Sequence, residues 1–350
     1  GPDQRAGVAG AVAAGGRARV TAIGEYRRTP THVVDTRDAP PDVLEDAGVA
    51  DWARLTWREV GRPYRVKRWA EEKRAFEREQ GRPLPVKEGW EKFNRSFHEL
   101  FLKDVEGEQR AGRRRLLREL AGARVRAAAE TIEELVQLAA WNRVHRVQDA
   151  IWDPRGKRAL LEGLGHRRPR VLFLGAADGY EAMQLAAMYP GGEVVLVDYD
   201  DFCRTDRFGK FPEAYPFLGA DPATGGKRIW HRPEMAIHFE VADIRDLPFG
   251  AEFDIVVSVG LVEHFDDRHK PEAFDFHRRF LKPGGTAVIT TPRDQWRGRA
   301  FYHLMADRMN FGYRELMTVR QLGLYARENG FRIERAGVIK AHNGLVCRPR

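Results

Sequence analysis

Three side chains stand where this sequence can do chemistry, each at or just after the end of an apolar run. Asp198 ends the run VVLVD, 19 positions after Gly179. A carboxylate in that place can accept hydrogen bonds from both hydroxyls of an adenosine ribose. Glu263 and His264 follow the run FDIVVSVGLV, and a histidine, which titrates near neutrality, can take a proton from a hydroxyl. These residues predict an adenosine-containing cofactor beside a group that can act as a base.

Alternating strands and helices in the carboxyl-terminal part of the chain must position these side chains. The hydrophobic pattern predicts strands over residues 171–174, 193–197, 236–241, 253–259, 285–291 and 331–339. It predicts helices over residues 181–188, 270–281 and 319–329. Buried parallel strands with helices on both faces form a doubly wound sheet, which binds ligands at the carboxyl ends of its strands. We therefore expect an α/β fold of the Rossmann-like kind.

Several motifs follow one another in order between about residues 150 and 345. The first strand runs into LGAADG, the second ends at Asp198, and the third leads into VADIRD with Asp243. The fourth strand, in FDIVVSVGLVEHF, is followed by a helix and then by LKPGGTAVITTP. This order resembles the class I methyltransferases that use S-adenosylmethionine, and the LVEHF segment resembles their small-molecule branch. The resemblance implies a seven-stranded sheet, S-adenosyl-L-methionine as the cofactor, and methyl transfer to a small molecule of the natural-product or cofactor-biosynthesis type.

The resemblance also assigns roles to residues at the ends of the first four strands. Glu263 and His264 are expected as catalytic residues where the acceptor meets the methyl group, with His264 either a base or a substrate contact. The positions expected to bind the cofactor are Gly175, Ala176, Ala177, Asp178, Gly179, Asp198, Tyr199, Ala242, Asp243, Ile244, Val259 and Gly260.

The chain departs from the family pattern in three places. Phe173 stands where members often have an acid, and Ala177 stands where they have a glycine, although a positive φ costs alanine more than glycine. The stretch between Asp198 and Asp243 is also longer than usual. Its extra segment, residues 201–235, is rich in aromatic residues and glycine, which suggests a substrate lid or docking loop.

The sequence divides into three zones. Residues 1–40 are expected to be a flexible or poorly ordered amino end, with RARVTAIGEY and THVVDT as candidate short strands. Residues 41–153 have helical periodicity with aromatic anchors such as Trp52, Trp57 and Trp90, and are expected to cap the substrate site or to bind a partner. Residues 154–350 form the expected methyltransferase domain. Within the helical zone, Trp141, His145 and Trp152 are candidates to line the acceptor pocket.

Charge and composition bear on the partners. The net charge of +8 and a pI near 9.6 are compatible with a polyanionic partner, but acids and bases are mixed in most segments, which favours a solvated surface. The resemblance of LVEHF to the small-molecule branch leads us to expect a small-molecule acceptor. An RNA or ribosomal methyltransferase is the first alternative, with the cluster Arg113–Arg115 contacting phosphates. A catalytically silent scaffold that binds the cofactor is the second, because of Phe173 and Ala177. The acceptor, the attacked atom (O, N, C or S) and homodimer formation stay open.

Other functions are not indicated. Cys203 and Cys347 are far apart, and the group His264, Asp266, Asp267 and His269 matches no metal-binding signature, so neither a disulfide nor a metal is expected. No apolar stretch reaches the roughly 20 residues that span a bilayer, and no signal segment is present. We therefore expect a cytoplasmic protein without membrane contact.

Overall fold

The computed structural model describes residues 45–67, 69–82, 105–148, 158–177, 179–211, 213, 217–304, 313–339 and 342–350. The side chains of Trp141 and His145 lie outside this description, as do Asp178, Trp90 and Trp152. The candidate strands RARVTAIGEY and THVVDT also lie outside it.

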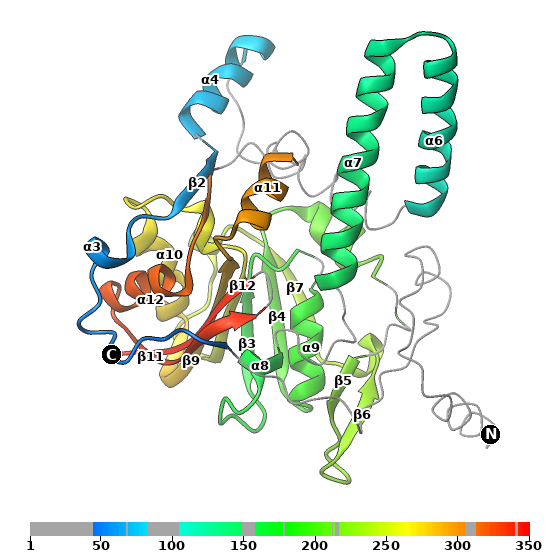
Figure 1. Ribbon diagram of the computed structural model, residues 1–350. Helices are drawn as coiled ribbons and strands as arrows, with labels where there is room; N and C mark the ends of the chain where they lie inside the picture. Colours follow the sequence, from blue (N-terminus) through cyan, green and yellow to red (C-terminus); the bar gives the residue numbers. More distant parts are fainter. Residues whose placement is uncertain are drawn as a thin grey trace, which may run out of the picture.

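An eight-stranded sheet forms the centre of the molecule, in the order β1-β11-β12-β9-β8-β3-β4-β7 (Figure 1). Five adjacent strands run parallel, and β12 is antiparallel to both of its neighbours. The seven longer strands confirm the predicted seven-stranded sheet, to which β1 adds a two-residue edge. The bounds are β1 Glu45–Asp46, β3 Arg170–Leu174, β4 Glu193–Asp198, β7 Ile237–Val241, β8 Phe253–Val259, β9 Leu281–Pro292, β11 Phe331–Ile339 and β12 His342–Pro349.

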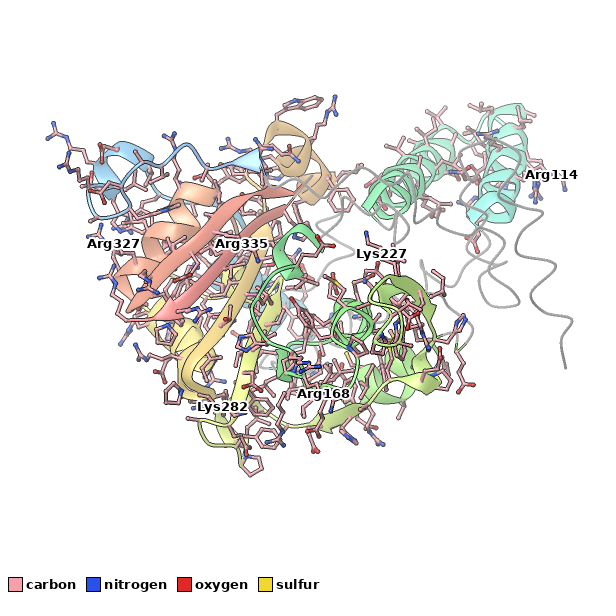
Figure 2. All side chains as sticks on the ribbon, turned by 90° about the horizontal axis from the view of Figure 1, so that it is seen from below. Arg114, Arg168, Lys227, Lys282, Arg327 and Arg335 are labelled. Carbon is pink, nitrogen blue, oxygen red and sulfur yellow. The ribbon has the colours of Figure 1, made fainter. Side chains whose placement is uncertain are left out.

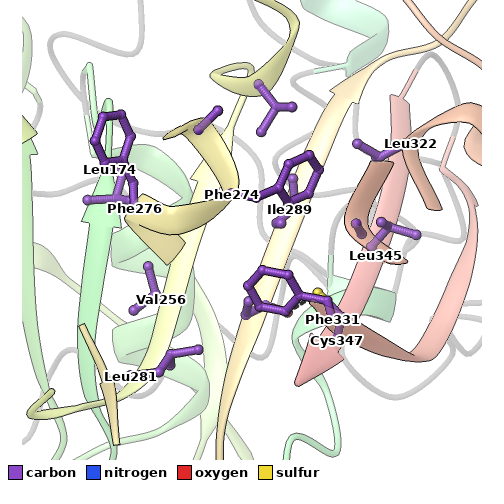
Figure 3. Close-up of a cluster of buried hydrophobic side chains, with 14 of the residues drawn as sticks. Leu174, Val256, Phe274, Phe276, Leu281, Ile289, Leu322, Phe331, Leu345 and Cys347 are labelled. Carbon is purple, nitrogen blue, oxygen red and sulfur yellow. Dashed lines mark hydrogen bonds between the residues drawn. The ribbon is translucent and has the colours of Figure 1, made fainter. Parts of the chain in front are cut away.

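Helices cover both faces of this sheet, as a doubly wound fold requires. Along β3, Leu172 and Leu174 point into a core that also contains residues of α10 and α12. Val171 and Phe173 point to the opposite face, into a second core under α8 and α9. Figure 3 shows part of the first core, where Phe274 and Phe331 lie close to Ile289. The bounds are α8 Arg158–Leu161, α9 Tyr180–Met188, α10 Lys270–Arg279 and α12 Val319–Glu328.

Residues 45–67 differ from the helical pattern that the sequence predicts there. They contain only the short helix α3 (Trp57–Val60), and β2 (Tyr64–Lys67) pairs with β10 (Arg314–Leu316). Trp52 lies against Gly323 of α12, where a Cβ would come within 2.1 Å of the indole ring. The Trp57 ring lies 4.4 Å from that of Tyr325 on the same helix. These aromatic residues therefore pack on α12 of the sheet domain, because their own short segment has no apolar surface against which they could pack.

Two long helices stand beside this body as an antiparallel hairpin (Figure 1). They are α6 (Val105–Ala121) and α7 (Val125–Gln148), and α4 (Trp69–Gln80) precedes them in the chain. Gln137 of α7 donates a hydrogen bond to the Leu304 carbonyl at the end of α11 (Trp296–Leu304), 3.2 Å away. This contact ties the hairpin to the segment that follows β9.

The segment of residues 201–235 forms a hairpin against α9. It begins with a π-helical turn, η2 (Cys203–Phe208), and contains β5 (Phe217–Ala220), β6 (Lys227–Trp230) and the turn η3 (Arg232–Glu234). A Cβ on Gly219 would come within 1.8 Å of the Ala187 carbonyl oxygen, so β5 lies directly on α9. Figure 1 shows the β5–β6 hairpin extending away from α7 and α11. Phe217 of β5 is buried beside α9, and Phe208 of η2 lies against Gly179 at the start of that helix. The role of the segment as a substrate lid or docking loop stays a prediction.

Candidate active site

The predicted cofactor positions come together at one edge of the sheet. Backbone hydrogen bonds join the residues that follow neighbouring parallel strands, from Ala176 to Val197 (3.0 Å), Ala242 to Asp198 (3.1 Å) and Gly260 to Thr290 (3.0 Å). These bonds connect β3 to β4, β4 to β7 and β8 to β9, and β8 pairs with β3 up to Ser258 and Leu174. The glycine-rich turn, Asp198, Ala242 and Gly260 therefore form one continuous row. This is the edge at which doubly wound sheets bind nucleotides.

The turn after β3 has the backbone conformation that small residues permit. Gly175 has φ 67° and Gly179, at the start of α9, has φ 73°. Ala177 has φ 51°, so it occupies the left-handed region despite its Cβ. Phe173, in the place of the family's acid, is 1% exposed and packs in the core under α9. Phe173 therefore has a structural role in this chain, and the described residues of the turn have a positive φ at Gly175, Ala177 and Gly179.

Replacing Ala177 by glycine is expected to raise the free energy of unfolding by about 0.5 to 1 kcal/mol. Glycine removes the left-handed strain of about 1 to 2 kcal/mol but loses more backbone entropy on folding. Urea unfolding measures the change. Ala176→Gly, in the same turn but without a positive φ, is the matched control and is expected to be destabilising. Equal losses in the two variants would show that Ala177 carries no strain.

Asp198 is held at the end of β4 by backbone donors. Its carboxylate accepts hydrogen bonds from the backbone N–H groups of Ala177 and Asp200, each at 3.1 Å. Burial raises the pKa of Asp198 above its ordinary value, while these two bonds and the Arg207 cation act in the opposite direction. An ionised carboxylate has more acceptor sites than these backbone bonds use, so its oxygens retain acceptor capacity. Two ribose hydroxyls are donors that fit such an acceptor-only group, so the residues present fit an adenosine ligand.

Asp243 lies one strand further along the edge and is exposed. It begins the turn η4 (Ile244–Asp246), and its carboxylate accepts from the backbone N–H of Arg245 at 2.9 Å. The Arg245 guanidinium lies 3.2 Å from the same carboxylate and also pairs with Glu272 at 2.7 Å. An adenine amine would thus have to share Asp243 with Arg245. Ala242 and Ile244, which flank Asp243 in the chain, and Tyr199, which follows β4, are partly buried.

Glu263 and His264 form the turn η5 (Val262–His264) after β8. His264 Nδ1 lies 2.9 Å from the Tyr313 carbonyl oxygen, and a carbonyl can only accept. Nδ1 therefore carries the proton, which leaves Nε2 as the acceptor nitrogen of a neutral ring. Burial lowers the pKa of His264 well below its ordinary value, and the Arg314 cation adds to this effect. The ring is thus neutral at pH 7 with one fixed tautomer.

Glu263 is buried beside this ring, with Oε1 3.8 Å from His264 Nε2. Among the described residues, its Oε2 has no hydrogen-bond partner. Burial raises the pKa of Glu263 to about 7, against the opposing effect of Arg314. The pair therefore places a carboxyl group that titrates near neutrality next to an unprotonated imidazole nitrogen. Groups of this kind can perform acid–base catalysis.

The titration of Glu263 predicts how stability depends on pH. A carboxyl whose pKa is about 7 when folded and about 4.5 when unfolded binds its proton more tightly in the folded state. Stability from this group is complete below pH 4.5 and is lost as the pH rises to 7, by on the order of 3 kcal/mol. Urea unfolding at several pH values is expected to show this decline in the wild type and a flatter profile in Glu263→Gln. Identical profiles would contradict the burial of an ionisable group.

A buried network under η5 was missed by sequence reasoning. Lys270 Nζ donates to the Val262 carbonyl at 3.0 Å and to Glu315 Oε2 at 2.8 Å. It also donates to the Phe265 carbonyl, so it binds both ends of η5. Glu315 accepts from the Tyr313 hydroxyl, and the Tyr313 backbone holds His264. Lys270 and Glu315 are thus positioned to fix the Glu263–His264 pair.

The acids near the start of α10 have protein partners. Asp266 Oδ1 lies 2.6 Å from His269 Nδ1, and Asp267 accepts from the Tyr325 hydroxyl. In the part of the chain that the structure describes, no group of three or more His, Cys, Asp or Glu side chains is arranged to hold a metal ion. Among the described helices, none has the length and apolarity needed to cross a membrane.

Several solved structures are similar to this chain at low sequence identity. The Burkholderia thailandensis 1,6-didemethyltoxoflavin-N1-methyltransferase, with bound 1,6-didemethyltoxoflavin and S-adenosylhomocysteine, is 16% identical, with a TM-score of 0.40 over 59% of this chain and 80% of that one. Human N-acetylserotonin methyltransferase in complex with S-adenosylmethionine is 14% identical, with a TM-score of 0.39 over 64% and 56%. An Aquifex aeolicus methyltransferase dependent on S-adenosylmethionine is 14% identical, with a TM-score of 0.40 over 54% and 87%. No curated protein matches the chain in sequence.

A family model described as a methyltransferase domain matches residues 127–336, which is more than half of the chain. The match includes every described position in the row of strand ends, and it begins within α7. The chain therefore belongs to the methyltransferase domain family and is a methyltransferase dependent on S-adenosylmethionine.

Proposed function

We propose that this enzyme methylates a hydroxyl-bearing small molecule from which His264 removes the proton. The observation that carries this proposal is the bond from His264 Nδ1 to the Tyr313 carbonyl, which leaves Nε2 as the basic nitrogen. An oxygen acceptor must lose a proton as it attacks the sulfonium methyl group, and a positioned base accelerates this loss. Glu263, 3.8 Å from Nε2, stabilises the positive charge that then forms on the ring.

The cofactor occupies the row of strand ends in this proposal. The Asp198 carboxylate binds the ribose hydroxyls, and the turn from Gly175 to Gly179 lies along the methionine end. Asp243 and Ile244 would hold the adenine, and Val259 and Gly260 would border the sulfonium. Support comes from the backbone bonds that align these strands and from the small residues that let a ligand approach the backbone.

The helical region covers the acceptor side of this site. Within the 41–153 zone, we assign the cap to α7. The bond between Gln137 and the Leu304 carbonyl supports this assignment, because α11 follows β9 on the carboxyl edge of the sheet. A cap of this kind excludes water from the reacting atoms and orients the acceptor for in-line attack.

The distribution of cations favours a small acceptor over RNA. Figure 2 shows Arg114, Lys227, Lys282 and Arg327 spread across the width of the molecule. Many cations have nearby acids, as Arg170 has Glu193 and Glu252. A nucleic-acid surface would concentrate unpaired cations on one face.

Transfer of a labelled methyl group tests the proposal. The enzyme is incubated with methyl-labelled S-adenosylmethionine and either hydroxylated small molecules, their O-methylated counterparts, or bulk RNA. The proposal expects label in the free hydroxyl compounds and none in the blocked ones. Label that enters RNA, with binding that weakens steeply as salt rises, would contradict it.

A further inference from the structure

We propose that the α6–α7 hairpin is a dimerisation surface that packs against the same hairpin of a second copy of this chain. The proposal concerns assembly and does not depend on the acceptor or on the role of His264.

Exposed aliphatic side chains are concentrated on this hairpin. Among the described residues, large hydrophobic side chains that are exposed number seven, and five of them lie here. They are between 48% and 77% exposed, and they are Leu117, Leu120, Val125, Ile132 and Val136. Soluble proteins rarely leave such side chains clustered in water, so a cluster indicates an interface.

The five side chains share one face of the hairpin. Gly112 of α6 and Leu135 of α7 face each other, since a Cβ on Gly112 would lie 2.6 Å from Leu135 Cδ2. At about 100° per residue, the exposed side chains lie about 60° to 140° around their helices from this line, all in the same direction of rotation. Because the helices are antiparallel, this rotation places the exposed side chains of both helices on the same side of the hairpin. Arg115 and Glu134, which form an ion pair between the helices, lie on the opposite side.

The pattern on α7 is that of a coiled-coil seam. Val125, Ala129, Ile132 and Val136 follow one another at spacings of four, three and four residues, and all are exposed. This is the spacing of the a and d positions of a heptad, which pack against another helix. The seam is turned away from α6, so it needs a helix from outside the hairpin.

The α7 helix of a second copy can pack against this seam in an antiparallel register. Val125 of each copy packs on Val136 of the other, and Ala129 packs on Ile132. The same register brings Arg126 of one copy beside Glu133 of the other, twice by symmetry. Among the described residues, Arg126 forms an ion pair with the exposed Glu130 at 3.4 Å. An exposed pair of this kind has little energetic value, so Arg126 can turn to a partner. The face is therefore complementary to itself in shape and in charge, as a two-fold interface requires.

Sedimentation equilibrium over about two orders of magnitude in concentration tests the proposal. The wild type is expected to be dimeric, and the pair of changes Ile132→Glu and Val136→Glu is expected to raise the dimer Kd by about 100-fold or more. Trp296→Glu, which replaces a side chain 73% exposed on α11, is the matched control and leaves the dimer intact. Circular dichroism and binding of S-adenosylhomocysteine verify that each variant is folded.

Charge reversal tests the register. Arg126→Glu and Glu133→Arg alone are each expected to raise Kd about 5-fold, and the two together return it to within about 2-fold of the wild type. A monomeric wild type would overturn the proposal. So would a dimer that survives Ile132→Glu with Val136→Glu, because another surface would then hold it. If the effects of the two charge reversals on Kd simply added, and the double variant did not recover, the antiparallel pairing would be wrong.

Discussion

His264→Asn is expected to lower kcat by about 10²- to 10⁴-fold while leaving the affinity for S-adenosylhomocysteine unchanged within about 2-fold. The asparagine amide can still donate to the Tyr313 carbonyl, which is 2.9 Å from Nδ1 in the wild type. It has no nitrogen that accepts a proton in place of Nε2. The substitution therefore removes the base and keeps the bond that holds the turn. Steady-state kinetics with the acceptor and calorimetry with the cofactor product measure the two effects.

His269→Asn is the matched control for this prediction. His269 lies five residues away, is 57% exposed and pairs with Asp266, so its loss is expected to change kcat less than about 2-fold. If His264→Asn also retained nearly full kcat, His264 would be a structural contact and the proposed base would be wrong. If it lost cofactor affinity instead, the turn would belong to the cofactor site.

Lys270→Met is expected to lower the free energy of unfolding by about 3 to 5 kcal/mol. Methionine matches the length of lysine but leaves Glu315 buried without its cation, and Lys270 and Glu315 side chains are only 1% and 5% exposed. The carbonyls of Val262 and Phe265 also lose their donor. Urea or thermal unfolding measures the loss, and the double variant Lys270→Met with Glu315→Met is expected to recover part of it because no unpaired charge remains.

Lys282→Met provides the control for burial. Lys282 pairs with Asp254 at 3.1 Å, but its side chain is 43% exposed, so the loss is expected to be below about 1 kcal/mol. Equal effects of the two methionine substitutions would show that the network under η5 contributes no more than a surface ion pair.

The sheet was predictable where apolar residues run without interruption. The run VVLVD of β4 and the run of β8 belong to strands buried on both faces, so their pattern depends only on the strand itself. The strand β12 was not assigned, because Asn343 and Gly344 break its apolar run. Contacts with residues far away in the sequence explain both. The Asn343 amide donates to the Met317 carbonyl, and a Cβ on Gly344 would collide with Leu160.

The sequence predicted those site residues that lie at the end of a strand recognisable by its own apolar pattern. Asp198 ends one recognisable strand and Glu263 follows another, so their place at the carboxyl edge follows from topology. Arg314 and Glu315 gave no signal, because two charged residues in a three-residue strand resemble an exposed loop. The burial of Glu315 depends on Lys270, 45 positions away, and both Arg314 and Glu315 pair with β2. The same holds for Trp52, whose place against Gly323 no local pattern indicates.

Calorimetric titration of S-adenosylhomocysteine into the wild type and Asp198→Ala tests the central claim, that the Asp198 carboxylate binds the ribose of the methyl donor. The substitution is expected to weaken binding by about 1 to 3 kcal/mol, or about 5- to 150-fold in Kd, through the loss of hydrogen bonds to a charged acceptor. Circular dichroism confirms the fold, and Asp243→Ala serves as a comparison at the next strand end. Unchanged affinity in the Asp198 variant, or no binding by the wild type, would contradict the account.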